Sequence, residues 1–292
     1  MAGKESGAVV VTGASTGIGR ATALFLDKKG YRVFAGVRKQ ADAKALAADA
    51  SDQLTPITID VTKERSIKAA KDKVQRVVGK DGLVGLVNNA GVGDGGPVET
   101  MDLDILRNVL EVNLVGQVAV TQAFLPLIRK APGTIVFIAS IGGRIASPFM
   151  SPYNTSKFAV EALGESLRQE LAPWEIDVVV IEPGSIDTPI WKKGAETIDD
   201  QMAKLKPAAK RLYSKQLRRM DEVLTETANR GIAPEKVAKV IHTAISSENP
   251  KHRYLVGRDA KIAAKLKGAL PDRTFKKLID RQVKMPTDVP SK

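Results

Sequence analysis

The chain has 292 residues, 43% of them hydrophobic, and a formal net charge of +12. This length and apolar content predict an α/β protein with a sizeable core in one structural domain. The sequence has no cysteine, which excludes disulfides and thiolate metal sites, and its two histidines argue against a metal enzyme, so we expect no metal.

The positive charge is concentrated near the carboxyl terminus. Residues 1–191 carry 21 basic and 21 acidic side chains, whereas residues 192–292 carry 24 and 12. The basic segment contains no zinc pattern and few interleaved aromatic residues, which argues against a nucleic-acid partner. No signal peptide or run of 18 apolar residues is present, so we expect a soluble cytoplasmic protein, with peripheral contact with a membrane surface left open.

The first pattern along the chain joins an apolar run to a glycine-rich turn. Residues 8–12 predict a buried strand, and the sequence TGASTGIG at residues 12–19 leads from it into a helical pattern. Gly13, Gly17 and Gly19 allow the backbone to approach a pyrophosphate closely, while the helix N-terminus supplies unpaired N–H groups. A tight turn without a ligand is the alternative.

The second strand, predicted at residues 31–37, ends where a dinucleotide-binding fold reads the adenosine ribose. An acidic residue there would accept a hydrogen bond from the 2′-hydroxyl, but Arg38 and Lys39 follow the strand. A guanidinium can instead pair with a 2′-phosphate through two hydrogen bonds, so this position favours NADP. The alternative is that both residues are solvated loop charges.

The alternation of strands and helices continues to the end of the chain. Two loops that follow strands are candidate cofactor contacts. Asp60 and Val61 are placed to contact the edge of the adenine ring, and the small residues of NNAG at residues 88–91 permit close approach to a cofactor. The further strands are predicted at residues 54–59, 83–87, 134–139, 176–182 and 253–257, and the further helices at residues 62–78, 103–128, 153–172 and 234–246.

A hydroxyl, a phenol and an ammonium follow the strand at residues 134–139. Ser140 ends that strand, and Ser151 with Pro152 predicts a helix cap that places Tyr153 in the first turn. Lys157 lies four residues further on the same face, where its charge is expected to lower the pKa of Tyr153. Such a tyrosine can exchange a proton with an alcohol or carbonyl oxygen. The alternative is an amphipathic helix surface.

Asn113 stands on the apolar face of the helix predicted at residues 103–128. A mid-helix asparagine there is commonly a core polar group with its hydrogen bonds satisfied. Beside Tyr153 and Lys157 it is also a candidate anchor of a proton relay through water.

Together these motifs resemble the short-chain dehydrogenase/reductase family. The likeness covers roughly residues 7–190 and rests on TGASTGIG, the Asp60–Val61 pair, NNAG, Asn113, Ser140, Tyr153 with Lys157, and Pro183–Gly184. It implies a Rossmann-type, doubly wound, seven-stranded parallel sheet, an NAD(P)(H) cofactor, and a catalytic tetrad of Asn113, Ser140, Tyr153 and Lys157. Arg38 is similar to the basic residue of NADP-preferring members, so we expect NADP(H), with NAD(H) left open; Thr16 stands where some such members have a second basic residue.

The cofactor-binding positions implied by the resemblance extend along the carboxyl ends of the strands. They are Gly13, Ser15, Thr16, Gly17, Ile18, Gly19, Arg38, Asp60, Val61, Asn89, Ala90, Gly91, Tyr153, Lys157, Pro183, Gly184, Ile186 and Thr188.

Beyond the core the pattern changes. We interpret residues 1–190 as the catalytic core, 191–233 as a substrate-binding lid with apolar residues at helical spacing, and 234–292 as the end of the core plus a helical, basic extension. In residues 258–285 apolar and lysine side chains lie mostly on different faces, typical of an interfacial helix broken at Leu270–Pro271. The alternative is that the apolar residues pack on the core.

The extension and the strand at residues 253–257 resemble the hydroxysteroid and retinol dehydrogenase-like subgroup. We therefore expect an oxidoreductase that interconverts a carbonyl and an alcohol on a lipophilic substrate, and the family resemblance implies a homodimer or homotetramer. The rival hypotheses are a catalytically silent regulator that senses the cofactor and a membrane-surface binding protein. The substrate's identity and the direction of reaction cannot be read from the sequence.

Overall fold

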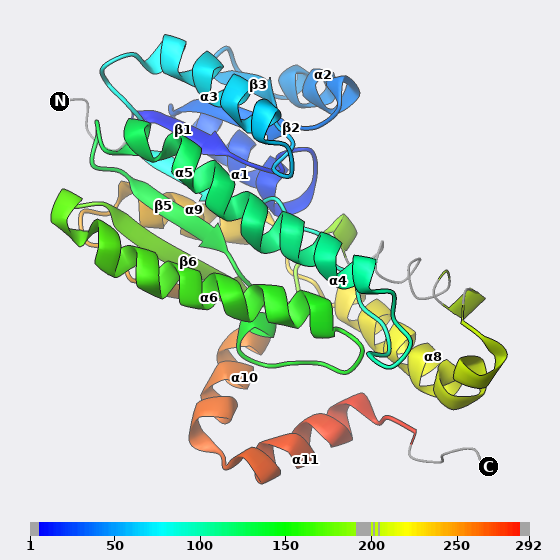
Figure 1. Ribbon diagram of the computed structural model, residues 1–292. Coiled ribbons are helices and arrows are strands. Elements are labelled where there is room, and N and C mark those ends of the chain that lie inside the picture. Colours follow the sequence, from blue (N-terminus) through cyan, green and yellow to red (C-terminus); the bar gives the residue numbers. More distant parts are fainter. Residues whose placement is uncertain (1–5, 191–199, 201, 204, 287–292) are drawn as a thin grey trace.

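A computed structural model describes residues 6–190, 200, 202–203 and 205–286. Its central sheet has seven strands, and helices lie on both sides of it (Figure 1). The strand order is β3-β2-β1-β4-β5-β6-β7, and all neighbours are parallel. The strands are β1 (Ala8–Val11), β2 (Arg32–Val37), β3 (Leu54–Thr58), β4 (Gly85–Asn88), β5 (Thr134–Ile138), β6 (Asp177–Pro183) and β7 (Arg253–Val256). The predicted doubly wound, seven-stranded parallel sheet is confirmed.

Helices cover both faces of the sheet, which is why the inner strands are apolar on both sides. One apolar core lies between the sheet and α3 (Glu64–Val78), α5 (Gly116–Ile128) and α6 (Ser151–Leu171). The other lies between the sheet and α1 (Gly17–Lys28), α2 (Gln40–Ala48) and α9 (Glu235–Ser246). Among these helices, α2 is not predicted from the sequence.

The strand order reverses direction at β1, which pairs with β2 on one side and with β4 on the other. In parallel α/β sheets a ligand site forms outside the carboxyl ends of the strands at such a switch point. The glycine-rich turn follows β1 and the NNAG loop follows β4, so both lie at this point of the fold.

The helix predicted at residues 103–128 is interrupted by one wider turn. It consists of α4 (Leu103–Leu110), a π-helical turn η1 (Glu111–Val115) and α5. By length and composition, Leu103–Ile128 is the one helical stretch among the described residues that could cross a membrane, but Val120, Phe124 and Ile128 are buried in the core of the fold. A core helix explains this apolar stretch.

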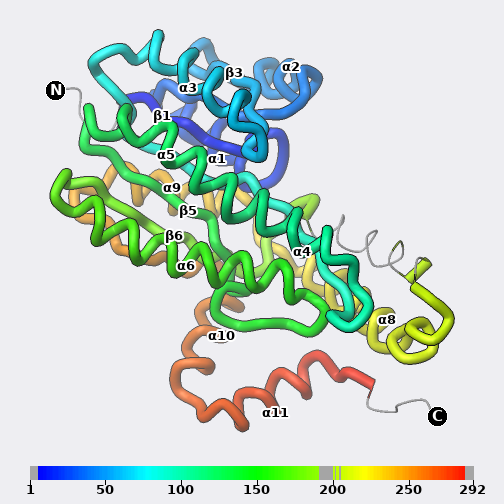
Figure 2. Tube along the Cα trace, viewed as in Figure 1, coloured from blue at the N-terminus to red at the C-terminus, as the bar shows by residue number. Residues whose placement is uncertain are grey.

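Beyond the sheet, α8 (Pro207–Asn229) and the helices α10 (Arg258–Ala269) and α11 (Asp272–Val283) complete the chain. Figure 2 shows α10 leaving the body of the protein and α11 turning back towards α8. The predicted break at Leu270–Pro271 is confirmed, because α10 ends at Ala269 and α11 starts at Asp272.

Candidate active site

The glycine-rich turn and the NNAG loop are joined by hydrogen bonds across the switch point. The Thr12 hydroxyl accepts hydrogen bonds from the backbone N–H groups of Asn89 and Ala90, both at 3.0 Å. The Asn89 amide donates to the carbonyl oxygens of Thr12 and Gly13. Gly13 has φ +64°, and a Cβ there would lie 2.8 Å from the Ala90 Cα, so glycine is required.

The first turn of α1 has no capping side chain and no acidic residue. Thr16 precedes the helix, and its exposed side chain makes no capping hydrogen bond. None of the residues in the first turn of α1 is acidic. Its backbone N–H groups can therefore hold a pyrophosphate, which fits the dinucleotide expected at this turn. The other expected residues of the turn, Ser15, Ile18 and Gly19, also lie here.

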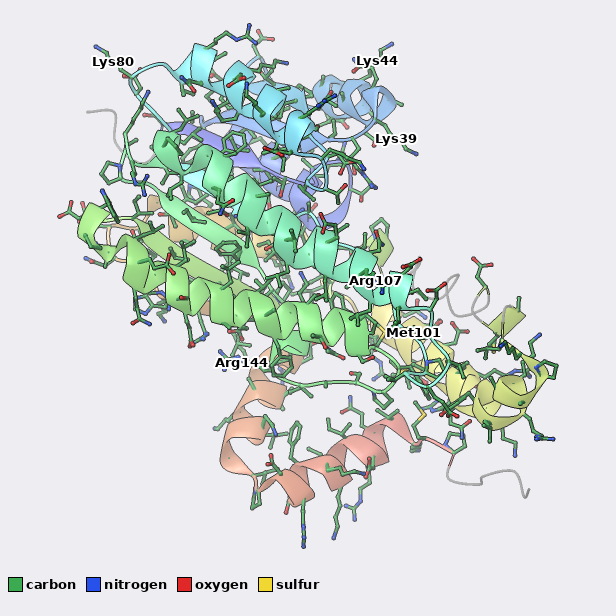
Figure 3. The ribbon with its side chains drawn as sticks, in the orientation of Figure 1. Lys39, Lys44, Lys80, Met101, Arg107 and Arg144 are labelled. Carbon is green, nitrogen blue, oxygen red and sulfur yellow. The ribbon has the colours of Figure 1, made fainter. Side chains whose placement is uncertain are left out.

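The ribose end of the expected cofactor site lies beside β2 and β3. Arg38 follows β2 and is exposed, and Asp60 follows β3. Burial raises the pKa of Asp60, but hydrogen bonds from Thr62 and the charges of Arg38 and Lys63 outweigh it, so its pKa lies below the ordinary value. Figure 3 shows Lys39 at the outer surface near α2. Exposed cations at this strand end can meet a phosphate.

The loop after β6 reaches back to the glycine-rich turn. Thr188 is buried, and a Cβ on Gly17 would lie 3.0 Å from its Cγ2. Ile186 is buried and its backbone forms a bridge with Ile232. Asp259 accepts a hydrogen bond from the backbone N–H of Ser185 at 2.7 Å, which ties α10 to this loop.

Tyr153 lies in the first turn of α6, as predicted, and Ser140 follows β5. Both are buried. The helix starts at Ser151 after Met150, which makes no capping side-chain bond, so the prediction that Ser151 caps it is wrong. Burial raises the pKa of Tyr153, and a hydrogen bond with Ser140 opposes the rise. This direction is opposite to the one expected from Lys157, and it keeps the phenol protonated.

Lys157 points from α6 to the carboxyl end of β5. Its Nζ donates to the Ile138 carbonyl oxygen at 2.8 Å and lies 5.7 Å from the centre of the Tyr153 ring. Burial lowers the pKa of Lys157 to about 8, although the charge of Glu161 opposes this fall. Lys157 and Tyr153 therefore lie together, and both titrate away from their ordinary ranges.

Asn113 is fully buried in η1 and binds two segments of the site. Its amide donates to the Val92 carbonyl oxygen and to the Ser156 hydroxyl, both at 2.9 Å, and its Oδ1 accepts from the Val92 N–H. A Cβ on Gly91 would lie 3.3 Å from that Oδ1 and 3.8 Å from the Lys157 Nζ. Asn113 and Lys157 thus border the same space beside Gly91. The proton relay through water at Asn113 stays a prediction.

Two residues that support the site are absent from the sequence prediction. The Ser156 hydroxyl accepts a hydrogen bond from the Asn113 amide and donates one to the Tyr153 carbonyl oxygen at 2.7 Å. Asn154 donates to the Gly142 carbonyl oxygen at 2.9 Å and so holds the segment after Ser140 against α6. Their only signal in the sequence is their position next to Tyr153 and Lys157.

The structure brings most of the predicted residues to one edge of the sheet. The tetrad residues lie around β5, α6 and η1, whereas Arg38 and Asp60 lie at the distant end, beside β2 and β3. The NNAG loop follows β4, between these two groups, whereas Pro183 and Gly184 stand at the end of β6, on the other side of β5. This order along the strand ends suits a long, two-part cofactor.

Comparison with known proteins agrees with this arrangement. The short chain dehydrogenase family matches residues 7–199. An NADPH-dependent 3-dehydrocapnine reductase from Ornithobacterium rhinotracheale is 34% identical, over 94% of this chain and 96% of the relative. Mouse retinol dehydrogenase 5 (37%) and bovine 17-beta-hydroxysteroid dehydrogenase type 6 (38%) each match over 87% of this chain and 81% of their own.

A solved short chain dehydrogenase from Burkholderia cenocepacia, in complex with NADP, shares the fold with a TM-score of 0.71 and 26% identity, over 97% of this chain and 100% of its own. The expected likeness to hydroxysteroid and retinol dehydrogenases is confirmed by the relatives. The chain belongs to the short-chain dehydrogenase family and is an oxidoreductase that interconverts an alcohol and a carbonyl.

Proposed function

We propose that the protein is an NADP(H)-dependent dehydrogenase/reductase of a lipophilic alcohol or carbonyl compound. The juxtaposition of Ser140, Tyr153 and Lys157 at the carboxyl end of β5 carries the proposal. The exposed Arg38 supports NADP(H), as do the NADPH dependence named for one relative and the NADP bound to a solved neighbour. NAD(H) remains the second candidate.

Each polar residue has a separate task in this proposal. A bound nicotinamide dinucleotide supplies or accepts the hydride. Ser140 and Tyr153 donate hydrogen bonds to the substrate oxygen, where negative charge develops, and Tyr153 transfers the proton. Lys157 binds the nicotinamide ribose and presents a positive charge near the phenol, and Asn113 holds α6 in register with the loop at Val92.

An apolar lid supports a lipophilic substrate. We propose that residues 191–233 form this lid, although residues 191–199, 201 and 204, including Trp191, lie outside the described residues. In α8 the buried Leu217, Met220 and Leu224 pack with apolar residues that include Phe149 and Met150, which precede Tyr153 by a few residues. The apolar side of α8 therefore faces the segment that leads into the catalytic helix.

Two contacts hold α8 in this position. Tyr213 hydrogen-bonds Glu99 and packs edge-on against Phe149, with ring centres 6.1 Å apart. At the other side of α8, Arg219 donates to the Val283 carbonyl oxygen at 2.8 Å, which links the lid to α11. The lid is thus tied both to the loop before α4 and to the extension.

A substrate panel scored by NADPH consumption tests the proposed function. Long-chain, steroidal and retinoid carbonyl compounds are expected to give higher kcat/KM than small polar carbonyl compounds, because each buried CH₂ adds about 0.8 kcal/mol. The same panel with NADH measures the cofactor preference. Faster turnover of the small polar compounds would refute the lipophilic assignment.

We also propose a homo-oligomer built on the helix at residues 103–128, which comprises α4, η1 and α5, and on α6. Leu103, Val115 and Phe158 are large apolar residues of these helices that remain about half exposed. Twofold symmetry is the commonest arrangement of soluble oligomers. Light scattering at micromolar concentration is expected to give a dimer or tetramer mass, and Phe158→Glu to lower it; a monomeric wild-type protein would contradict this.

A peripheral contact with an anionic membrane is a further proposal, based on the extension. Phe275 and Val283 of α11 are buried, whereas Ile262 and Leu278 are exposed among lysines, so only part of the apolar face packs on the protein. Vesicles with anionic lipid are expected to co-sediment the protein at low salt and to release it near 0.15 M, where charges are screened beyond about 8 Å. Absence of binding at low salt would exclude this contact.

A further inference from the structure

Glu161 is a buried carboxylate one helical turn beyond Lys157. It lies on α6, is 8% exposed, and has the same i, i+4 relation to Lys157 that Lys157 has to Tyr153. Gly143 packs against this turn, because a Cβ there would lie 2.9 Å from the Lys157 carbonyl oxygen and 3.3 Å from the Glu161 Cγ. The segment after Ser140 therefore shields the carboxylate from water.

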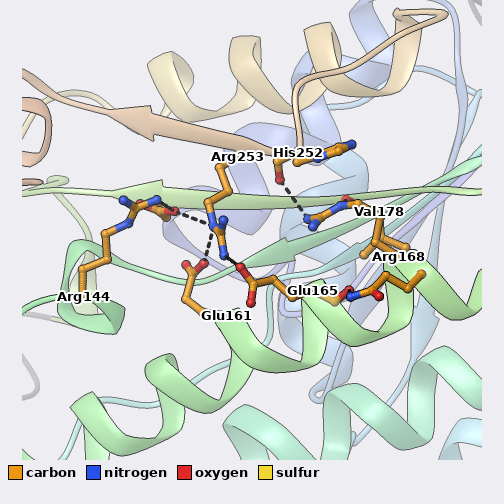
Figure 4. Close-up of polar contacts among 9 residues, drawn as sticks. Arg144, Glu161, Glu165, Arg168, Val178, His252 and Arg253 are labelled. Carbon is orange, nitrogen blue, oxygen red and sulfur yellow. Dashed lines mark hydrogen bonds and ion pairs between the residues drawn. The ribbon is translucent and has the colours of Figure 1, made fainter. Parts of the chain in front are cut away.

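Arginines from distant parts of the chain hold the carboxylates of this region (Figure 4). Arg253 of β7 donates through Nε to the Glu161 Oε2 at 3.0 Å and also pairs with Glu165. The same Nε lies 3.5 Å from the fully buried Glu182, which Arg144 binds with two contacts of 2.6 Å. Glu161 is thus held in place by Arg253.

Carboxylates and cations surround Glu161 on several sides. The carboxylates of Glu161, Glu165 and Glu182 face the guanidinium groups of Arg144 and Arg253. Arg168, the next basic residue of α6, donates to the carbonyl oxygens of Val178 and His252. Arg168 also interacts electrostatically with Glu165 and Glu161, and Lys157 is a further cation that interacts with Glu161.

The Glu161 Oε1 is buried and accepts no hydrogen bond from the described residues. Burial, together with the charge of Glu182, raises the pKa of Glu161 to about 7, although Arg253 and Arg144 oppose the rise. The pKa of Lys157 is lowered to about 8 by burial, against the charge of Glu161. The two groups therefore titrate over neighbouring pH ranges.

We propose that Glu161 is a positioning residue of the reaction, whose carboxylate keeps the buried Lys157 protonated while Arg253 holds it in place. The proposal rests on the proposed role of Lys157. Loss of this charge destabilises the ammonium, so Lys157 gives up its proton at a lower pH. Lys157 then loses its positive charge beside Tyr153 at a pH closer to 7.

The direct test is an NMR titration of the Lys157 side chain in the cofactor-free protein, with the signal assigned through Lys157→Arg. In Glu161→Gln the affinity of Lys157 for its proton is expected to fall by about tenfold, the lower end of the range for loss of a nearby opposite charge. Glu165→Gln is the matched control, because Glu165 shares Arg253 with Glu161 but is more exposed and lies a turn further from Lys157. This control is expected to leave the Lys157 midpoint unchanged.

An unchanged midpoint in Glu161→Gln, or an equal fall in both variants, would overturn the proposal. Glu161→Asp keeps the charge and is expected to restore the wild-type midpoint. If Glu161→Gln does not fold, the wild-type titration decides, because coupling between Lys157 and Glu161 predicts a curve broader than that of one group. A single-site curve for Lys157 would contradict the coupling.

Turnover gives an independent readout. Because Lys157 acts in its protonated form, kcat falls as pH rises through its pKa, and Glu161→Gln is expected to move this alkaline limb to lower pH, with little change in KM for the substrate. The NMR titration needs no substrate. A failure of the substrate panel would therefore count against the proposed function, and a failure of the titration against the role of Glu161.

Discussion

Tyr153→Phe is expected to keep the fold and cofactor binding and to lower kcat by about 10²-fold or more, the scale of general acid–base catalysis. The substitution removes only the phenolic oxygen. Burial raises the pKa of this phenol, so Tyr153 is protonated at neutral pH and can donate its proton to a substrate oxygen in the reducing direction. Steady-state kinetics with NADPH and fluorescence titration of NADPH binding measure the two effects separately.

Tyr254→Phe is the matched control. The Tyr254 hydroxyl accepts one hydrogen bond from the exposed backbone of Lys251 and lies on β7, away from Ser140. Its loss is expected to leave kcat within about twofold, since exposed hydrogen bonds contribute little. Near-normal turnover by a folded Tyr153→Phe variant would exclude the proposed proton donor.

Arg38→Ala is expected to weaken NADPH binding by about 1.5–3 kcal/mol, roughly 10- to 150-fold, while NADH binding stays nearly the same. The physical reason is the loss of a charge-assisted contact with the 2′-phosphate, which NADH lacks. Arg38 is exposed directly after β2, so its side chain is available for this contact. Dissociation constants of both nucleotides for the wild type and the variant give the ratio.

Arg32→Ala controls for the loss of a positive charge, because Arg32 is exposed at the opposite end of the same strand. It is expected to leave the NADPH to NADH affinity ratio unchanged. The same ratio in wild type and Arg38→Ala would show that Arg38 is a solvated loop charge, the alternative that the sequence left open.

The strands, the glycine turn and the positions of Ser140, Tyr153 and Lys157 could be predicted because their signals are local. An apolar run of strand length, a glycine at positive φ, and a tyrosine and lysine four residues apart on a helix are each visible within a few neighbouring residues. Parallel pairing then brings the ends of β1, β4 and β5 to one edge.

The features that could not be predicted depend on contacts between distant segments. The π-helical turn at Glu111–Val115 places Asn113 against Val92 and Ser156, and no periodicity in the sequence distinguishes it from an ordinary helix. The sequence predicts that Lys157 lowers the pKa of Tyr153, but burial raises it, and burial is a property of the whole fold.

The Arg253–Glu161 contact could not be predicted either, because it joins distant segments of the chain. It joins residues 92 positions apart, and Arg144 reaches Glu182 across 38 positions. The extension could be predicted only in part. Its break after Ala269 follows from Pro271, which the sequence shows, whereas the burial of Phe275 and Val283 depends on how α11 turns back.

Transfer of deuterium from NADPH deuterated at both positions of nicotinamide C4 to a lipophilic aldehyde or ketone tests the central claim most directly. Mass spectrometry of the product alcohol is expected to show one deuterium per molecule with the wild-type protein, and a trace at most with Tyr153→Phe over the same time. Product alcohol without deuterium, or no consumption of NADPH with any carbonyl compound of the panel, would contradict the account.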